Sequence, residues 1–521
     1  MKRLVLGIMF SIITLVLTAC PEGTPPVVGT FTISGGTVEI TAGSSKTVNI
    51  NIGRTGGFTD LVSLALSGSL PTGVTSGGFN PTQADASSVL TLNVGKTAIA
   101  GSYSITVTGT AGETKITTVN LTVKAAAPTT ITVKGKVISE ITGQPIANVP
   151  VVIGGRPVAT TNAQGQFTIT EVTKPYDITV VVPFSHVAII YQGLTRVDPT
   201  INYFGPVSSP LKSAKVEGTV SGGAGYPEPA NHKSEIAFDS PDIIDGSSRI
   251  INTASGDYSA TLDWVKGLAS VTAHALQWKN SGGLPSDYTG YGKTAAIDLA
   301  DNGTFANQDI SMTDVTEGNF SGNVTIPSGY FLDGKNLAVS FGNDANINIV
   351  DDSTTNLAFN YISPQITGAT IIAAASASNS FTISLRVKAG LATNASGVTI
   401  AIPEGSQEVL PVSGATGVDT TTPFSWTGFA NGVHLVMVQG GSSVYFIFTK
   451  DTSTTLPDLG ALGLGLTPST GYSWRVMGMA PYSSMDQAAE AGNKLFGIFT
   501  GNIGVSGAFS RSAGRGFVTA P

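Results

Sequence analysis

Glycine and other turn residues divide the sequence into short apolar runs, and this pattern limits the folds open to the chain. The 521 residues include 63 glycines and 27 prolines, 41% are hydrophobic and only 12% are charged. Runs of Val, Ile and Thr alternate with turns rich in Gly, Pro, Asn and Asp, and no long run has the spacing of an amphipathic helix. At about 100 to 200 residues per domain, several domains are expected. The sequence therefore predicts an all-β fold of tandem β-sandwich domains.

The N-terminus has the features of an export signal. Lys2 and Arg3 precede an apolar stretch, residues 4–17, which is short for a membrane-spanning helix of roughly 20 residues. It ends in Leu17-Thr18-Ala19-Cys20, which resembles the cleavage site of a bacterial lipoprotein. The resemblance implies a signal peptide over residues 1–19, a lipid on Cys20 and a Pro-rich tether over residues 20–26. The alternative is a plain secretory signal, with Cys20, the only cysteine, left as a free thiol.

The same resemblance predicts location and partners. It implies attachment to a membrane through the lipid anchor, and Pro21 after the cysteine favours the outer membrane or cell surface, facing outside the cytoplasm. The net charge is −7 and no run of Lys and Arg occurs, so no nucleic-acid partner is expected. The low content of charge suits contact with polysaccharide or a surface protein, and it suits an extracellular spacer equally well.

Residues 27–124 form the first predicted sandwich. Val48-Asn49-Ile50-Asn51-Ile52 alternates between apolar and polar residues, as in a strand with one buried face. The segments Leu70-Pro71-Thr72-Gly73-Val74 and Ala100-Gly101-Ser102-Tyr103 resemble an immunoglobulin-like domain common in bacterial surface proteins. That resemblance implies a sandwich without a disulfide and without catalysis. Residues 125–128 are the expected linker after it.

Residues 130–184 resemble the carboxypeptidase regulatory-like domain, a small transthyretin-like sandwich. The resemblance is carried by Val133-Lys-Gly-Lys-Val137, by Thr142-Gly-Gln-Pro-Ile146 and by the stretch from Thr161 to Ile169. Gly165 is expected in a tight hairpin that needs positive φ, with Phe167 pointing into the core. The resemblance implies no peptidase activity, and it implies a broad architecture shared with starch-binding-like domains, a carbohydrate-binding-like fold.

Three more sandwiches are expected after this one. Gly218-Thr219-Val220 and Gly322-Asn323-Val324 repeat the start of the preceding domain, so residues 210–316 and 317–404 are interpreted as possible diverged repeats. A chance match is the alternative in so Gly-rich a chain. Residues 405–521 resemble a fibronectin type III-like domain through Pro423-Phe-Ser-Trp426 and Tyr472-Ser-Trp474. Those aromatic residues are either core or a ligand platform, and residues 485–491 are the best candidate for a helix.

Few residues point to chemistry. His186, His232, His274 and His434 show no zinc-binding spacing, and no nucleophile motif occurs, so no catalytic residue is assigned. Carboxylates gather in loops, and the weak calcium candidates are Asp239, Asp242 and Asp245. A solvated turn is the alternative for that loop. Apart from the lipid, no cofactor is expected.

One stretch is a candidate ligand surface because aromatic side chains hold sugar rings. It contains Trp264, Trp278, Tyr288 and Tyr291. The two tryptophans are either core residues or part of this surface, whereas the tyrosines lie in a loop-like context and are expected to be exposed.

These observations favour one function and leave two alternatives. The first is a non-catalytic, membrane-anchored surface lipoprotein that presents tandem sandwiches for adhesion or for binding of carbohydrate or another polymer. The second is a structural spacer or envelope-assembly component without a small ligand. The third is a hydrolase whose site the sequence does not reveal.

Overall fold

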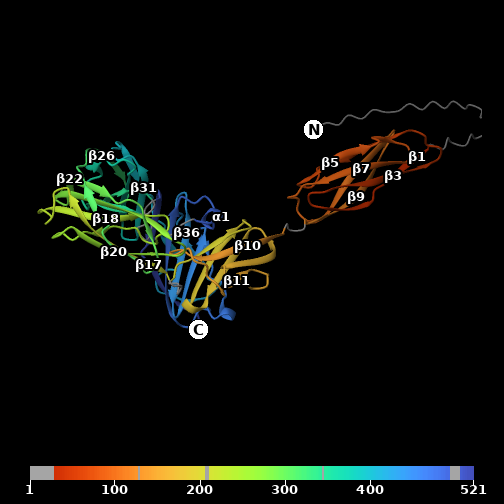
Figure 1. Cartoon of the computed structure of the whole chain (residues 1–521). Coiled ribbons are helices and arrows are strands. Elements are labelled where there is room, and N and C mark those ends of the chain that lie inside the picture. Colours follow the sequence, from red (N-terminus) through yellow and green to blue (C-terminus); the bar gives the residue numbers. More distant parts are fainter. Residues whose placement is uncertain (1–28, 127–129, 206–210, 343–344, 493–504) are drawn as a thin grey trace, which may run out of the picture. The chain divides into compact units, whose positions relative to one another are not determined.

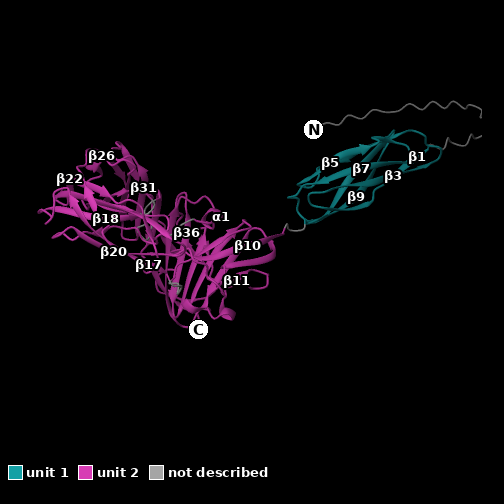
Figure 2. Cartoon of the chain, viewed as in Figure 1, with its two compact units in different colours: residues 1–128 teal, residues 129–521 magenta. Residues whose placement is uncertain are grey.

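The structure, a computed structural model, describes residues 29–126, 130–205, 211–342, 345–492 and 505–521. Within these ranges nearly all regular secondary structure is strand, and the chain forms two compact units, residues 1–128 and 129–521 (Figure 2). The predicted fold class, all-β with tandem β-sandwiches, is confirmed. The expected signal peptide, Cys20 and tether lie outside the described residues. Across the described ranges, no helix is long and apolar enough to cross a membrane.

Unit 1 is the first sandwich (residues 30–124). Its two sheets have the strand orders β1-β3-β7-β5 and β2-β9-β8-β4-β6 (Figure 1). Alternating residues of both sheets fill one core that includes Phe31, Ile50 and Val107. The strands are β1 (Thr30–Ser34), β2 (Thr37–Thr41), β3 (Ser45–Thr55), β4 (Val62–Ser67), β5 (Val74–Asn80), β6 (Gln83–Ala84), β7 (Ser87–Val94), β8 (Gly101–Ala111) and β9 (Glu113–Lys124).

Unit 2 begins with the second sandwich (residues 130–203). The boundary expected at residue 184 falls inside this domain: two later strands complete it, and the last one pairs in parallel with the first. The elements are β10 (Thr130–Ser139), β11 (Pro150–Ile153), β12 (Ala159–Thr160), β13 (Gln166–Thr173), β14 (Tyr176–Val182), the 3-10 turn η1 (Pro183–Ser185), β15 (Val187–Leu194) and β16 (Thr200–Tyr203). The expected turn is present, since Gly165 has φ +69° and the Phe167 side chain is buried, but the flanking strands β12 and β13 pair with β11 and β10 rather than with each other.

The third sandwich (residues 212–312) and the fourth (residues 317–401) follow. The third contains β17 (Lys212–Gly222), β18 (His232–Asp239), β19 (Arg249–Ile250), β20 (Asp257–Trp264), β21 (Ala269–Ser281), β22 (Leu284–Lys293), β23 (Ile297–Leu299), β24 (Thr304–Phe305) and β25 (Ile310–Met312). The fourth contains β26 (Glu317–Thr325), β27 (Phe331–Ser340), β28 (Asn346–Asp352), β29 (Ala358–Pro364), β30 (Thr370–Ser378), β31 (Thr382–Leu391) and β32 (Val398–Ala401).

The fifth sandwich (residues 408–519) ends the chain. Its elements are β33 (Glu408–Leu410), β34 (Ala415–Val418), β35 (Phe424–Trp426), β36 (Val433–Gly440), β37 (Ser443–Thr449), β38 (Ser453–Thr454), the 3-10 turn η2 (Gly460–Leu462), β39 (Gly471–Ala480), the helix α1 (Met485–Ala488), β40 (Gly507–Ser512) and β41 (Arg515–Thr519). The predicted helix is present as α1, shorter than expected, with Ser484 as its N-cap: the Ser484 hydroxyl accepts a hydrogen bond from the Gln487 N–H.

One sheet runs through three of these sandwiches. Among the described residues it has 14 strands, with the main order β12-β11-β14-β15-β37-β36-β39-β40-β31-β30-β27-β28. β15 of the second sandwich pairs in parallel with β37 of the fifth, from Val187↔Val444 to Tyr191↔Phe448. β40 of the fifth pairs with β31 of the fourth. The domains expected as separate at 130–184, 317–404 and 405–521 are therefore joined through their sheet edges.

In three sandwiches, a glycine in the first strand packs closely against an aromatic ring. A Cβ on Gly135 would lie 2.3 Å from the Phe167 ring, and on Gly322 it would lie 2.8 Å from the Phe359 ring and 1.9 Å from the Val398 carbonyl oxygen. A Cβ on Gly218 would likewise come too close to the Tyr258 ring and the Gln308 carbonyl. In each case the first strand lies between an antiparallel partner that carries the aromatic residue and a parallel last strand. The interpretation of residues 210–316 and 317–404 as diverged repeats stays a prediction.

Candidate functional site

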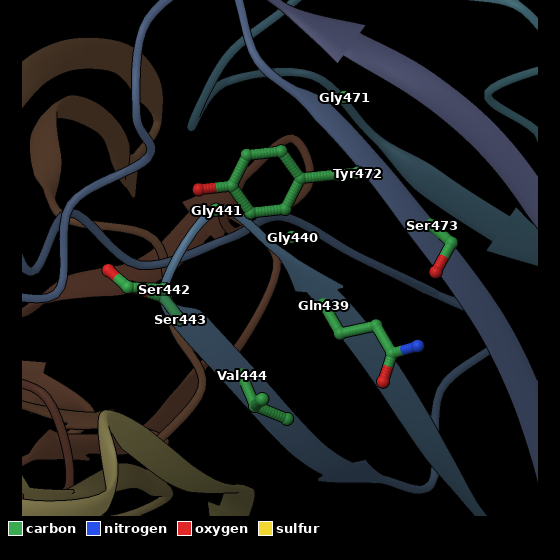
Figure 3. A pocket seen from close by; sticks show the side chains of 9 residues that line it. All are labelled: Gln439, Gly440, Gly441, Ser442, Ser443, Val444, Gly471, Tyr472 and Ser473. Carbon is green, nitrogen blue, oxygen red and sulfur yellow. The ribbon is translucent and has the colours of Figure 1, made fainter.

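A groove in the fifth sandwich is the candidate functional site (Figure 3). It has a volume of about 500 Å³ and lies at the β36–β37 hairpin beside the start of β39. The hairpin and β39 supply its walls because Gln439 pairs with both Val444 and Ser473 in the sheet register. The lining residues are Gln439, Gly440, Gly441, Ser442, Ser443, Val444, Gly471, Tyr472 and Ser473.

Two glycines shape this groove. A Cβ on Gly440 would lie 2.5 Å from Cγ of Tyr472, so only glycine lets the ring lie against the hairpin, as Figure 3 shows. Gly441 has φ +55°, which the tight turn requires, and a Cβ there would lie 3.2 Å from the Tyr472 hydroxyl. The Gly-Gly-Ser-Ser turn therefore fixes both the hairpin and the position of the ring.

Tyr472 is held firmly at the floor of the groove. Its side chain is buried, its ring stacks on Phe517 with centroids 5.7 Å apart, and its hydroxyl accepts a hydrogen bond of 3.1 Å from the Thr467 N–H. Sequence analysis left open whether Tyr472, Trp426 and Trp474 were core or platform, and the structure buries all three side chains. Ring stacking on a ligand is thus not what this groove offers.

The groove offers hydroxyl, amide and backbone groups without charge. Gln439 and Ser473 are half-buried, Ser442 is exposed, and among the described residues that line the site there is no Asp, Glu, His, Lys or Arg. General acid–base chemistry needs a titratable group near the reacting atoms, and this lining supplies only the packed phenol of Tyr472. A neutral, hydroxyl-rich ligand is the chemical class that such a lining can bind.

Three of the four residues of the predicted aromatic surface are buried. Trp264, Trp278 and Tyr288 are 0%, 1% and 3% exposed, so the expected exposure of Tyr288 is wrong. Trp264 fills the core of the third sandwich, whereas Trp278 and Tyr288 lie in a core shared with the fourth. The reason is that residues 288 and 291 belong to β22, which packs against β29 of the neighbouring sandwich rather than facing solvent as a loop.

Tyr291 is half-buried and belongs to an aromatic stack between the third and fourth sandwiches. Its hydroxyl lies 2.9 Å from Nδ1 of His274, and its ring stacks on Phe341 with centroids 5.4 Å apart. The His274 ring also stacks on Phe341 at 4.7 Å. Burial lowers the pKa of His274 to about 4, so the imidazole is neutral near pH 7. The four predicted aromatic residues therefore serve packing.

The three aspartates considered for calcium do not converge. The carboxylate of Asp239 lies against Gly342 of the fourth sandwich, where a Cβ would come within 2.4 Å of both its oxygens. Asp245 forms an ion pair of 3.1 Å with Arg249, and Asp242 is exposed. Among the described residues, no three His, Cys, Asp or Glu side chains gather closely enough to hold a metal ion.

His434 is the other deeply buried histidine. Its Nε2 accepts a hydrogen bond of 3.0 Å from the Phe429 N–H, and its ring packs edge-on against Trp426. Burial lowers its pKa to about 4. A histidine that is buried and neutral, accepts a backbone hydrogen bond and packs against Trp426 has a structural role.

Comparison with known proteins adds little. No family model and no curated protein sequence matches the chain. The tandem Ig repeats of Dlar match with 11% identity over 34% of this chain and 98% of that chain, at a TM-score of 0.14. Domains 4–9 of the surface layer protein SbsC match with 12% identity over 94% and 82%, at 0.15. A tetra-tandem repeat in the extending region of a large adhesion protein matches with 14% identity over 68% and 96%, at 0.12. Scores this low carry no conclusion about function.

Proposed function

We propose that this chain is a non-catalytic surface scaffold held to a membrane by a lipid on Cys20. The observation that carries the proposal is the continuous sheet of unit 2, which joins the second, fourth and fifth sandwiches into one body. The third sandwich is tied to that body by its shared core with the fourth. The aromatic side chains that a sugar-binding surface would need pack in or against these cores. This packing favours a scaffold over an aromatic ligand platform.

The anchor and the surface location rest on the sequence. The lipoprotein-like cleavage site at Cys20 supports lipid attachment, and Pro21 supports the outer membrane or cell surface. The immunoglobulin-like, transthyretin-like and fibronectin type III-like assignments of the individual sandwiches belong to the same proposal. The uncharged groove and the two neutral, buried histidines support the absence of catalysis.

The anchor is tested in the producing cell. Wild-type protein should fractionate with membranes and incorporate labelled fatty acid, whereas Cys20→Ser should do neither. Soluble wild-type protein without label would overturn the anchoring. The scaffold is tested by limited proteolysis of residues 21–521, which should leave a resistant fragment that begins near residue 130. Rapid loss of the third or fourth sandwich from that fragment would contradict a single body.

Binding of a neutral polymer at the β36–β37 groove is the second candidate, favoured by its uncharged lining. The test is saturable binding of residues 21–521 to a panel of neutral polysaccharides. Ser442→Arg places a long cation at the rim and should abolish binding, whereas Ser281→Arg, at the exposed β21–β22 hairpin, is the matched control. Binding that survives Ser442→Arg, or no binding to any polymer, would remove this candidate.

A further inference from the structure

The second and the last strand of the first sandwich pair in parallel, whereas its first strand, β1, pairs antiparallel with β3. β2 pairs in parallel with β9, the last strand, through five register positions from Thr37↔Asn120 to Thr41↔Lys124. Because the two strands run in the same direction, the chain arrives at one end of this pair and leaves at the other. A pull on the two ends of the sandwich would therefore slide β2 along β9.

Contacts beyond the β2–β9 ladder extend this parallel pairing, called the seam below, at the N-terminal end of β2. The carboxylate of Glu113 accepts hydrogen bonds from the Thr30 hydroxyl and from the Phe31 N–H. The Gly35 N–H donates a bond of 2.9 Å to the Thr117 hydroxyl. Residues 30–35 are thereby bonded to the first half of β9 before the ladder begins.

The exit end is fastened as well. The Ala42 N–H donates a bond of 2.8 Å to the Lys124 carbonyl, and the Lys124 ammonium forms an ion pair of 2.6 Å with Glu39. The seam thus runs from residues 30–42 on one side to residues 113–124 on the other. The Glu39–Lys124 pair is more than half exposed on each side, and such pairs add little to equilibrium stability.

The direction of load decides what this seam can resist. When opposite ends of a parallel pair are pulled, the transverse hydrogen bonds of the ladder are strained together and must fail together. When the same end of both strands is pulled, the bonds are strained one at a time and the pair peels open. Forced unfolding depends on the height of the unfolding barrier rather than on the equilibrium free energy of unfolding. Bonds that add little to that free energy can therefore still raise the force needed to unfold the domain.

From this geometry we infer that the first sandwich is a force-bearing link, which carries tension between the N-terminal tether and unit 2 by loading the β2–β9 seam in shear. The inference rests on the proposed anchoring for the source of the tension, since an anchored chain is pulled when unit 2 is held by an outside surface. In the second, third and fourth sandwiches it is the first strand that pairs in parallel with a last strand: β10 with β16, β17 with β25 and β26 with β32.

The test is single-molecule force spectroscopy of residues 21–521 in two pulling geometries. In the first, handles are attached at residue 21 and at the C-terminus, which loads the seam in shear. In the second, the N-terminal handle is moved to a cysteine introduced by Thr41→Cys, at the exit end of β2 and opposite Lys124. Thr41 is exposed and residues 21–521 contain no other cysteine, so the fold and the labelling are preserved.

The unfolding of the first sandwich is recognised by its length. About 80 residues between Thr41 and Lys124 are released in the second geometry, which lengthens the chain by about 28 nm. The expected result is a several-fold higher unfolding force in shear than in the second geometry. Equal forces in the two geometries would overturn the inference, whatever the outcome of the Cys20→Ser experiment, because the purified protein needs no membrane.

A matched pair of variants tests the end contacts. Glu113→Ala removes the bonds to Thr30 and Phe31 and should lower the shear force while leaving the melting temperature nearly unchanged. Asp85→Ala removes a carboxylate that is more exposed than that of Glu113 and that pairs with Arg54 away from the seam, and it should leave the shear force unchanged. A shear force that is unaffected by Glu113→Ala, or equally affected by Asp85→Ala, would contradict the role assigned to the seam.

Discussion

The largest loss of stability is predicted for replacement of Lys335 in β27. Its side chain is 1% exposed, and so deeply buried a lysine is rare in a folded protein. Its ammonium group lies 3.1 Å from Oδ2 of Asp352 on β28, the residue opposite it in the ladder. It also donates hydrogen bonds of 2.6 Å to the Asn356 carbonyl and 3.1 Å to the Thr354 carbonyl. Lys335 shares the period-2 face of Leu337 and Val339, so its charge lies beside the core of the fourth sandwich.

Both carboxylate oxygens of Asp352, the other member of this pair, accept hydrogen bonds. The Tyr361 hydroxyl donates to its Oδ2 at 2.5 Å, and the Thr354 N–H donates to its Oδ1 at 2.8 Å. Burial alone would raise the pKa of this carboxyl, but the hydrogen bonds from Tyr361, Thr354 and Lys335 lower it to about 2. The Asp352 carboxylate is therefore charged near neutral pH, and the Lys335 ammonium is its counter-charge.

Lys335→Met keeps the volume of the side chain and removes its charge and its hydrogen-bond donors. It leaves Asp352 buried without a counter-charge and leaves two carbonyls without a donor, which is expected to cost about 3 to 5 kcal/mol of unfolding free energy. For a cooperative unit of this size, the melting temperature should fall by roughly 10 °C. The third and fourth sandwiches share a core, so their transitions should move together.

The assay is differential scanning calorimetry of residues 21–521 at pH 7. Asp352→Asn should also destabilise, and the double variant Lys335→Met/Asp352→Asn should lose clearly less than the sum of the two, because it leaves no unpaired charge. Lys388→Met, at a half-buried lysine of β31, is the matched control and should change stability by about 0.5 kcal/mol or less. A melting temperature of Lys335→Met within about 2 °C of wild type would refute the reasoning.

Three further outcomes follow from the structure. Because His434 and His274 have pKa values of about 4 when folded and an ordinary value of 6.5, the unfolded chain binds protons more readily. Their contribution to the free energy of unfolding should therefore be complete above pH 6.5 and fall between pH 6.5 and 4. The midpoints of urea unfolding across this pH range measure that fall, and His434→Gln should make it smaller. Asp352 has a lowered pKa, so its contribution should be present above about pH 4 and fall between pH 4 and 2, and Asp352→Asn should make acid unfolding shallower there. Gly322→Ala would force a Cβ against the Val398 carbonyl and should cost about 2 kcal/mol or more in urea denaturation, whereas Gly154→Ala, with no atom within 4 Å, should be nearly neutral.

Local features of the fold were predictable because their causes are local. The turn at Gly165 follows from its need for positive φ, and the Asn162 side chain accepts bonds from the Gln164 and Gln166 N–H groups, as the polar turn position requires. The strand runs followed from alternation with turn residues. The Gly440-Gly441 turn, which shapes the groove, was visible between two apolar runs, but nothing in the sequence shows that Tyr472 packs against it.

The candidate surface at Tyr288 and Tyr291 failed because its burial is not local. Apart from Leu284, Tyr288 and Tyr291, β22 consists of small or polar residues and a proline, and only the position of the fourth sandwich decides whether solvent or β29 covers the face that carries the rings. An aromatic residue on such a face is equally suited to a sugar ring and to a neighbouring domain. Sequence spacing cannot separate these two cases, because the partner strand lies in another sandwich.

The joined sheet of unit 2, by contrast, did leave a signal. A strand with one wet face alternates, whereas the runs Ile178–Val182 and Val187–Tyr191 are apolar almost throughout, as in strands buried on both faces. Val181 and Ile190 pack toward the fifth sandwich, while Ile178 and Ile189 pack toward the second. An isolated sandwich would expose β15 as an apolar edge that invites aggregation. Pairing β15 with β37 of the same chain removes that edge, so the edge pairing that makes unit 2 one body also protects its most apolar strands from other chains.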